Sequence, residues 1–459
     1  MEKNLFQKLP KVDILMKNEK LEEISKKLSY HNYYQAVKDG IEFFRNKIKN
    51  NEIENFSEDE IILKIKEISG IKNKLNLRRV INGTGTIIHT NLGRSILNEK
   101  ITEDLGEILL DYSNLEYDLE TGSRGSRYSH IEKLICEITG AEGALIVNNN
   151  AAAVILCLNE FANRKNTIVS RGELVEIGGS FRIPEIMKLA GTALKEVGTT
   201  NKTHIFDYEN NIDEETAVLL KVHTSNFKIT GFTEGTDKKD IAELGKKHGL
   251  LTMEDLGSGV LVDFSKYGLS KEPTIQESIE SGMDIVTVSG DKLLGGPQCG
   301  IILGKKPLIE RLKKNQYLRA FRVNKITISI LENIFQYYKD EREAVKEIPV
   351  LNMITEKKEK VLERAEKLSF MLTEKNIENN VIETEAKIGG GSMPEETVES
   401  YAVCFNGDAV LLEKKFRGND IPVIGRIKSD RFIIDAKTLK EKDFEEILGA
   451  AERIFLWEM

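Results

Sequence analysis

One lysine in the run Ser289–Gln298 (SGDKLLGGPQ) has the surroundings of an amine that forms a Schiff base. The preceding stretch Met283–Val288 is apolar and rich in β-branched residues, which predicts a buried strand, so Lys292 lies in a tight loop after a strand end. A lysine amine condenses with an aldehyde only when it is neutral, and burial or nearby cations favour that form. The alternative for this run alone is a surface lysine in a glycine turn.

An aspartate follows a second predicted strand. The run Leu250–Glu254 has the pattern of a short strand, and Asp255 comes directly after it, before the turn Gly257–Gly259. A pyridoxal phosphate enzyme needs such an aspartate near its lysine. The carboxylate keeps the pyridine nitrogen protonated, so that the ring can accept electrons when a bond at the substrate's α-carbon breaks. The alternative is that Asp255 only caps a helix.

A third feature could hold a phosphate. The sequence predicts a strand over Ala144–Val147, a turn over Asn148–Asn150 and an apolar helix that begins at once over Ala151–Leu158. A helix N-terminus directly after a strand offers free backbone N–H groups and the positive end of the helix dipole to an anion. Neither a P-loop nor a GxGxxG pattern is present, so a cofactor phosphate is favoured over a nucleotide. We assign the binding of this phosphate to Asn149, Asn150 and Ala151.

From Arg79 onward the sequence has the pattern of an α/β domain. Short apolar runs such as Ile168–Ser170 and Ala217–Val222 alternate with amphipathic stretches such as Asp240–His248, which predicts a mostly parallel sheet with helices on both faces. Ligands of such sheets collect at the carboxyl ends of the strands. His223 follows one of these strands and could stack on the cofactor ring; a histidine satisfied by local backbone is an equally good interpretation. Ser289, at the end of another, is assigned to the cofactor site.

Two arginines follow the predicted strand Gly300–Leu303. Arg319 and Arg322 are three residues apart, so on a helix they would share a face, and two guanidinium groups on one face suit a tetrahedral oxyanion. Arg94, at the end of the loop HTNLGR, is the third candidate. The alternative is a solvated basic face.

Composition limits the class of protein. The chain has 459 residues with 40% hydrophobic content, which allows more than one domain and a large core. No apolar run approaches the length of a membrane span and no secretory signal is evident, so a cytoplasmic protein is predicted. The four cysteines and six histidines lack the spacing of a disulfide framework or a metal site, and neither is predicted.

The formal net charge of −8 is unevenly distributed. Residues 1–79 contain 17 Lys+Arg against 13 Asp+Glu, a net +4, whereas the remainder contains 49 against 61, a net −12. In the basic part, Leu21–Ile48 and Glu58–Ile68 show helical periodicity, and Ser57 is a plausible N-cap for the second helix. A basic helical segment of this kind could bind nucleic acid or serve only in packing or oligomerisation.

Three domains are therefore predicted: a helical domain over residues 1–75, a large α/β domain over 76–344 and a smaller α/β domain over 345–459. In the last of these, the long charged helix Glu356–Glu374 precedes strand-like runs at Tyr401–Phe405 and Arg431–Ile434, and the turn Gly389–Pro394 interrupts the pattern.

Several long segments resemble one family, that of bacterial selenocysteine synthase, the L-seryl-tRNA(Sec) selenium transferases. The segments are Arg78–Arg94, Thr121–His130, Asn148–Val154, Arg171–Met187, Glu254–Gly259 and Ser289–Gln298. The resemblance implies a pyridoxal phosphate enzyme of fold type I, the aspartate aminotransferase-like fold, in which Lys292 carries the cofactor. It also implies that the N-terminal domain, which opens with the family-like segment Leu5–Leu15, holds tRNA(Sec) charged with serine.

The reaction that the resemblance implies is a β-replacement on a serine esterified to tRNA. Lys292 would remove the α-proton, hydroxide would leave, and selenium from selenophosphate would add to the β-carbon. Arg94, Arg127, Arg319 and Arg322 would bind the substrates. Because the seryl carboxylate is an ester, no arginine is needed to clamp it, and Arg94, Arg319 and Arg322 stay available for the anionic donor. A homo-oligomer built from dimers, in this family a decamer, is also implied.

Two other classes of function share parts of this pattern. A pyridoxal phosphate lyase acting on a free amino acid or amino-sugar acid would share the core, but the basic N-terminal domain counts against it. A tRNA-binding protein that has lost catalysis is the second, and the intact Asp255 and Lys292 count against that.

Overall fold

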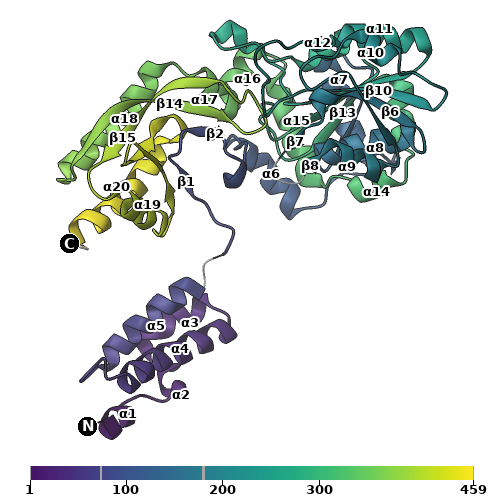
Figure 1. The fold of residues 1–459 in the computed structure, drawn as a ribbon. Coiled ribbons are helices and arrows are strands. Elements are labelled where there is room, and N and C mark those ends of the chain that lie inside the picture. Colours follow the sequence, from purple (N-terminus) through teal and green to yellow (C-terminus); the bar gives the residue numbers. More distant parts are fainter. Residues whose placement is uncertain (1, 73–74, 178–180, 458–459) are drawn as a thin grey trace. The chain divides into compact units, whose positions relative to one another are not determined.

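The computed structural model describes residues 2–72, 75–177 and 181–457 and consists of two compact units, Met1–Arg79 and Val80–Met459. The first unit is helical (Figure 1). Its helices are α1 (Glu2–Gln7), α2 (Val12–Leu15), α3 (Glu22–Lys27), α4 (Tyr30–Lys49) and α5 (Glu58–Lys72).

The helical periodicity of Leu21–Ile48 is divided between α3 and α4, because the chain becomes extended at Leu28 and Ser29 caps a new helix. Within α4, Gly40 allows a close helix crossing, since a Cβ there would lie 2.4 Å from Cγ1 of Ile65 on α5. Ser57 caps α5 as predicted: its Oγ accepts the N–H of Glu60 at 3.3 Å, and the Glu60 carboxylate accepts the N–H of Ser57. Local sequence thus defines most of this unit.

A seven-stranded sheet forms the centre of the second unit. In order across the sheet its strands are β5 (Gly143–Val147), β13 (Gly300–Gly304), β12 (Ile285–Ser289), β11 (Leu251–Gly257), β10 (Thr216–Val222), β6 (Asn166–Ser170) and β9 (Ala193–Val197). All neighbours are parallel except β13, which runs antiparallel to both β12 and β5. The loop 290–299 between β12 and β13 is too short for the crossover that a parallel pair requires.

Helices cover both faces of this sheet (Figure 1). Helices α8 (Asn150–Ala162) and α9 (Ile183–Ala190) lie on one face, and α10 (Ile205–Glu209), α11 (Lys238–His248) and α12 (Ile275–Glu280) on the other. Every residue of β5, β12 and β13 is buried, as the apolar runs of these strands predict for a sheet covered on both sides. The remaining helices of this unit are α6 (Ile101–Leu110), α7 (Glu132–Thr139), α13 (Lys306–Leu312), α14 (Tyr317–Phe321), α15 (Lys325–Tyr337), α16 (Glu341–Glu347) and α17 (Pro349–Thr355).

The C-terminal part contains a second sheet in the order β17 (Arg426–Lys428), β18 (Arg431–Asp435), β15 (Thr397–Phe405), β14 (Asn379–Gly389) and β2 (Thr86–Ile88). Helices α18 (Lys358–Glu374), α19 (Ala409–Arg417) and α20 (Phe444–Glu452) pack with it. Strand β1 (Ile81–Asn82) pairs with β16 (Val423–Ile424). Residues 81–88, predicted in the large domain, therefore pair with strands of the C-terminal part: β1 in a separate two-stranded sheet and β2 at the edge of the five-stranded sheet. Two short strands whose partners lie some 300 residues away leave no local signal of that pairing.

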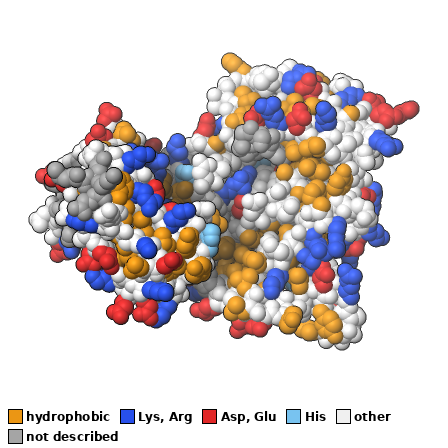
Figure 2. All heavy atoms as spheres, turned by 90° about the horizontal axis from the view of Figure 1, so that it is seen from below, with side chains coloured by type: hydrophobic (Ala, Val, Ile, Leu, Met, Phe, Trp, Pro, Cys, Tyr) orange, Lys and Arg blue, Asp and Glu red, His pale blue; other side chains and the backbone are white. Residues whose placement is uncertain are grey.

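Two properties of the described residues bear on function. No helix among them is both long and apolar enough to cross a bilayer. On the face of the molecule drawn in Figure 2, basic and acidic side chains are interspersed with apolar ones. A mixed surface of this kind does not by itself identify a nucleic-acid interface, so partners have to be inferred from particular sites.

Candidate active site

One edge of the large sheet collects the predicted functional residues. Val222 lies opposite Asp255, and Asp255 opposite Thr287, so the carboxyl ends of β10, β11 and β12 are aligned. Through β13, the end of β12 at Ser289 is level with the end of β5 at Val147. The turn after β5, Asp255 and the lysine loop consequently meet at the same edge.

Lys292 is buried at this edge, with 6% of its surface exposed. Burial lowers the pKa of its amine, the Arg94 guanidinium lowers it further, and the Asp255 carboxylate opposes both. Backbone hydrogen bonds fix the loop: Leu293 N–H donates to Ser258 O at 3.1 Å, and Gly296 N–H donates to Gly290 O at 2.8 Å. The amine is thus held in surroundings that favour its neutral, nucleophilic form.

Asp255 lies inside β11, which continues to Gly257, rather than after the end of the strand as predicted. Its carboxylate accepts hydrogen bonds from Asn150 Nδ2 at 2.7 Å and from Thr287 Oγ1 at 3.2 Å. Burial raises the pKa of Asp255, while these two hydrogen bonds and Lys292 lower it. A buried carboxylate in this situation is stabilised by a cationic partner, which a protonated pyridine nitrogen would supply.

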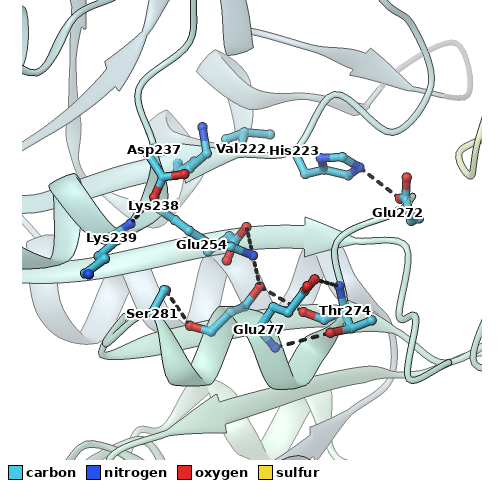
Figure 3. Close-up of polar contacts among 12 residues, drawn as sticks. Val222, His223, Asp237, Lys238, Lys239, Glu254, Glu272, Thr274, Glu277 and Ser281 are labelled. Atoms are coloured by element: carbon cyan, nitrogen blue, oxygen red, sulfur yellow. Dashed lines mark hydrogen bonds and ion pairs between the residues drawn. The ribbon is translucent and has the colours of Figure 1, made fainter. Parts of the chain in front are cut away.

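Glu254, the residue before Asp255, lies beside Lys238 (Figure 3). Glu254 faces Lys238 of α11, with 3.8 Å between Oε1 and Nζ, because successive side chains of a strand alternate between its faces. Only Asp255 of this acidic pair therefore belongs to the site.

The turn after β5 has the features of a phosphate cup. Asn149 caps α8 by accepting the N–H of Ala152 at 2.8 Å, and α8 begins at Asn150, one residue before the predicted start. The N–H groups of Asn150 and Ala151 have no acceptor among the described residues. Gly300 makes room for the turn, since a Cβ there would lie 2.3 Å from Asn149 O. These two amides could hold a phosphate, whereas the Asn150 side chain holds Asp255.

His223 is oriented by an acidic residue that the sequence analysis missed. Its Nε2 lies 2.9 Å from Oε1 of the buried Glu272 (Figure 3), and its backbone N–H donates to Asp255 O at 2.9 Å. Both residues line a cavity of ≈ 510 Å³ that also includes Met393 of the C-terminal part. Glu272 thus orients the imidazole ring, and Asp255 holds the backbone of His223. Glu272 has no strand or motif around it that would have identified it in the sequence.

The turn Gly389–Pro394 closes over the lysine. A Cβ on Gly391 would lie 3.0 Å from Lys292 Nζ, so only glycine leaves this space to the amine and its ligands. Glu395, the residue after the turn, forms an ion pair of 3.5 Å with Lys228 of the large domain. In the sequence this turn is visible only as a break in the pattern, whereas in the structure it forms a wall of the site.

In front of Lys292 lies a cavity of ≈ 360 Å³, here termed the lysine cavity. Arg94 lines it and pairs with Asp291, at 2.8 Å between Nη1 and Oδ2. The residues that line it are Thr86, Thr90, Arg94, Asn226, Lys292, Lys387, Gly389, Gly390, Gly391 and Pro394.

Arg319 and Arg322 line a different cavity of ≈ 370 Å³, here termed the arginine cavity, which shares no lining residue with the lysine cavity. They do not lie on one helix face as predicted, because α14 ends at Phe321 and Arg322 is extended. The N–H of Asn148 donates to Phe321 O at 2.9 Å, and Arg322 bridges to Val147. This pairing with the end of β5 replaces the next helical turn.

Arg127, predicted to bind substrate, is buried in the arginine cavity with its donors engaged. Its Nε donates to Glu116 Oε1 at 3.1 Å, its Nη2 donates to the same oxygen, and its Nη1 donates to Val323 O. Glu116 also lies 3.6 Å from Arg322. This geometry suits a residue that holds the segment around Arg322 in place.

Comparisons with known proteins match nearly the whole chain. A family model described as L-seryl-tRNA selenium transferase matches residues 80–440. Proteins named L-seryl-tRNA(Sec) selenium transferase from Clostridium botulinum (strain Loch Maree / Type A3) and Caldanaerobacter subterraneus subsp. tengcongensis are each 48% identical. The first match covers 98% of this chain and 99% of the relative, the second 98% of each. Among solved structures, D-glucosaminate-6-phosphate ammonia-lyase matches with a TM-score of 0.56 and 20% identity over 84% of this chain and 97% of that one, a likeness of fold.

Proposed function

The chain belongs to the L-seryl-tRNA selenium transferase family, and from this premise we propose that it converts L-seryl-tRNA(Sec) to L-selenocysteinyl-tRNA(Sec). Pyridoxal phosphate is the proposed cofactor and selenophosphate the proposed donor. The observation that carries the proposal is the juxtaposition of a buried lysine amine and a buried aspartate, Lys292 and Asp255, at the edge of the large sheet. We place the reaction in the cytoplasm.

The residues at this edge fit the cofactor. The amides of Asn150 and Ala151 would hold its phosphate, with Asn149 shaping the turn, and Asp255 would keep the proton on the ring nitrogen. His223 and Ser289 complete the proposed surroundings of the ring. When bound, pyridoxal phosphate supplies an electron sink for charge that develops at the substrate's α-carbon.

The proposed proton transfers use Lys292. Its neutral amine takes the α-proton of the seryl group, the Cβ–O bond breaks, and the hydroxyl leaves as water after taking up a proton. Selenium then bonds to the β-carbon, the α-carbon regains its proton from Lys292, and the phosphoryl group of the donor is lost to water.

The donor is an anion, and we propose that Arg94, Arg319 and Arg322 bind it. Within one chain Arg94 lines the lysine cavity and the other two line the arginine cavity. We therefore propose that a homo-oligomer built from dimers, with the decamer of the family as its expected form, brings the arginine cavity of one copy to the lysine cavity of another. Arg127 would position Arg322 and make no contact with substrate.

The N-terminal unit is the proposed tRNA-binding part. Several of its cations are neutralised locally, as in the pairs Lys20–Asp59 and Arg45–Glu42. Lys11, Lys17 and Lys38 are exposed and have no acidic partner among the described residues. Phosphate contacts by such side chains release counterions, so binding should weaken steeply as salt rises. Deleting residues 1–75 should abolish this binding and leave the cofactor absorbance of the core intact.

The deciding experiment offers the holoenzyme seryl-tRNA(Sec) and free serine in parallel, each with selenophosphate. Formation of selenocysteinyl-tRNA, together with a change in cofactor absorbance only on adding seryl-tRNA, is the expected result. Turnover of free serine with no response to seryl-tRNA would instead favour a lyase acting on a free amino acid.

A further inference from the structure

The lysine cavity contains one cation to which the proposed reaction gives no task. Lys387 lies on β14 opposite Thr86 of β2, and its backbone N–H donates to Gly85 O at 2.9 Å. Its exposed side chain lines the cavity. The side chain makes no hydrogen bond or ion pair with any residue that the structure describes.

The charged residues that line this cavity are all cationic. Its lining includes three cationic residues, Lys292, Arg94 and Lys387, but no aspartate or glutamate. Lys292 has to be neutral to act, and Arg94 is paired with Asp291 at 2.8 Å. The hydroxyl groups of Thr86 and Thr90 add further donors. Lys387 thus contributes a lining charge that no described residue compensates, and the cavity is suited to an anion.

We propose that Lys387 binds a phosphate oxygen of a substrate in front of Lys292. This inference rests on the proposed function, in which both substrates carry phosphate: seryl-tRNA in its 3′-terminal phosphodiester and selenophosphate in its phosphoryl group. An ammonium on a flexible stem is a point charge that accommodates a phosphate without a fixed orientation. The pairing of β14 with β2 holds the backbone, so only the side chain has to adjust.

A matched control lies in the same part of the chain. Lys360, on α18, is also exposed and has no side-chain partner among the described residues, but it lines neither cavity. Replacing Lys360 by Gln removes the same charge as replacing Lys387 and therefore measures the effect of net charge alone.

The test compares Lys387→Gln, Lys387→Arg and Lys360→Gln in the full-length holoenzyme. The dissociation constant for seryl-tRNA(Sec) is measured by filter binding at fixed salt, and the KM for selenophosphate by initial rates. Lys387→Gln should weaken one of the two by about tenfold, with kcat changed less than about threefold, because a charge-assisted contact to phosphate is lost. Lys387→Arg should restore most of that loss.

The two measurements identify the source of the phosphate. A loss confined to seryl-tRNA binding assigns Lys387 to the tRNA end, and a loss confined to the KM assigns it to the donor. The proposal is overturned if Lys387→Gln matches Lys360→Gln in both, or if it loses cofactor absorbance, since Lys387 would then serve the cofactor.

A second readout does not depend on turnover. Acetylation of lysines in the wild-type holoenzyme, read by peptide mass spectrometry, should be slowed at Lys387 and unchanged at Lys360 when inorganic phosphate is added. Protection in a protein that does not turn over seryl-tRNA would support phosphate binding at Lys387 and remove the proposed function. Turnover without protection would remove the inference alone.

Discussion

The lysine cavity and the arginine cavity are similar in volume and both are lined by cations, but only the second contains a carboxylate. Glu116 lies against Arg127 and within 3.6 Å of Arg322, whereas the lining of the lysine cavity has no acidic residue. A guanidinium with its donors engaged holds structure together, and a cation with an open donor is available to a ligand. The hydrogen-bond and ion-pair partners of a cation therefore indicate whether it positions other residues or binds a ligand, and they do so better than its residue type.

The largest effect should come from the lysine cavity itself. Replacing Lys292 by Ala removes both the nucleophile and the proposed base, so the rate of selenocysteinyl-tRNA formation should fall by about 10³-fold or more. Borohydride reduction of the wild-type holoenzyme, followed by peptide mapping, should attach the cofactor to the peptide containing Lys292. Attachment of the cofactor to another lysine would contradict the proposed active site at Lys292.

Asp255→Asn should have the next largest effect. An amide cannot hold the proton of the pyridine nitrogen, so the rate should fall on the order of 10²-fold while part of the cofactor absorbance remains. Thr287→Val, which removes only the 3.2 Å hydrogen bond to Asp255, is the matched control and should cost far less. Equal activity of Asp255→Asn and wild type would take Asp255 out of the mechanism.

These residues show what the sequence could and could not provide. Strand periodicity was sufficient to place Lys292 and the turn after β5 at one sheet edge, because these signals are local. Pairings across the chain were not visible: Asn150 with Asp255, Glu272 with His223, and Lys387 with Thr86. The prediction that one helix contains both Arg319 and Arg322 was wrong, because backbone pairing of Arg322 with β5 ends the helix at Phe321.

Complementation between two variants tests whether the arginine cavity of one copy acts on the lysine cavity of another. If Arg322 acts on the lysine cavity of a neighbouring copy, two inactive variants, Lys292→Ala and Arg322→Ala, should regain activity when co-expressed. With random mixing of two chains, about a quarter of such sites would contain both intact residues. Co-expression of Lys292→Ala with Asp255→Asn is the control, since both residues come from the same sheet edge of one chain and mixing cannot bring the two intact residues together in one site. Absence of recovery in the first mixture would place Arg322 in the cavity of its own chain or outside catalysis.

Glu116→Gln should have two smaller effects: it should destabilise the fold and strengthen donor binding. Arg127, whose side chain is 9% exposed, would lose its anion, so the free energy of unfolding should fall by about 1–3 kcal/mol. Arg322 would lose a competing carboxylate, so the KM for selenophosphate should fall by about twofold. Glu99→Gln, which removes an exposed pair with Lys442, should change neither measurement. A rise in KM would mean that Glu116 contributes to donor binding.

The smallest expected effect is a shift in the pH dependence of cofactor uptake, which replacing Arg94 should cause and replacing Arg319 should not. Burial and Arg94 lower the pKa of Lys292, so its reactive neutral form is present above that lowered pKa and is lost as pH falls through it. The rate at which the cofactor-free protein takes up pyridoxal phosphate should therefore rise with pH and then level off. Arg94→Gln removes a nearby cation and leaves Asp291 without its pair, and both changes raise the pKa of Lys292, so the rising limb should move to higher pH. Arg319→Gln, in the arginine cavity, should leave the limb in place. Uptake is measured by visible absorbance across a pH series. An equal shift of the rising limb in both variants would show that the two cavities share one electrostatic environment.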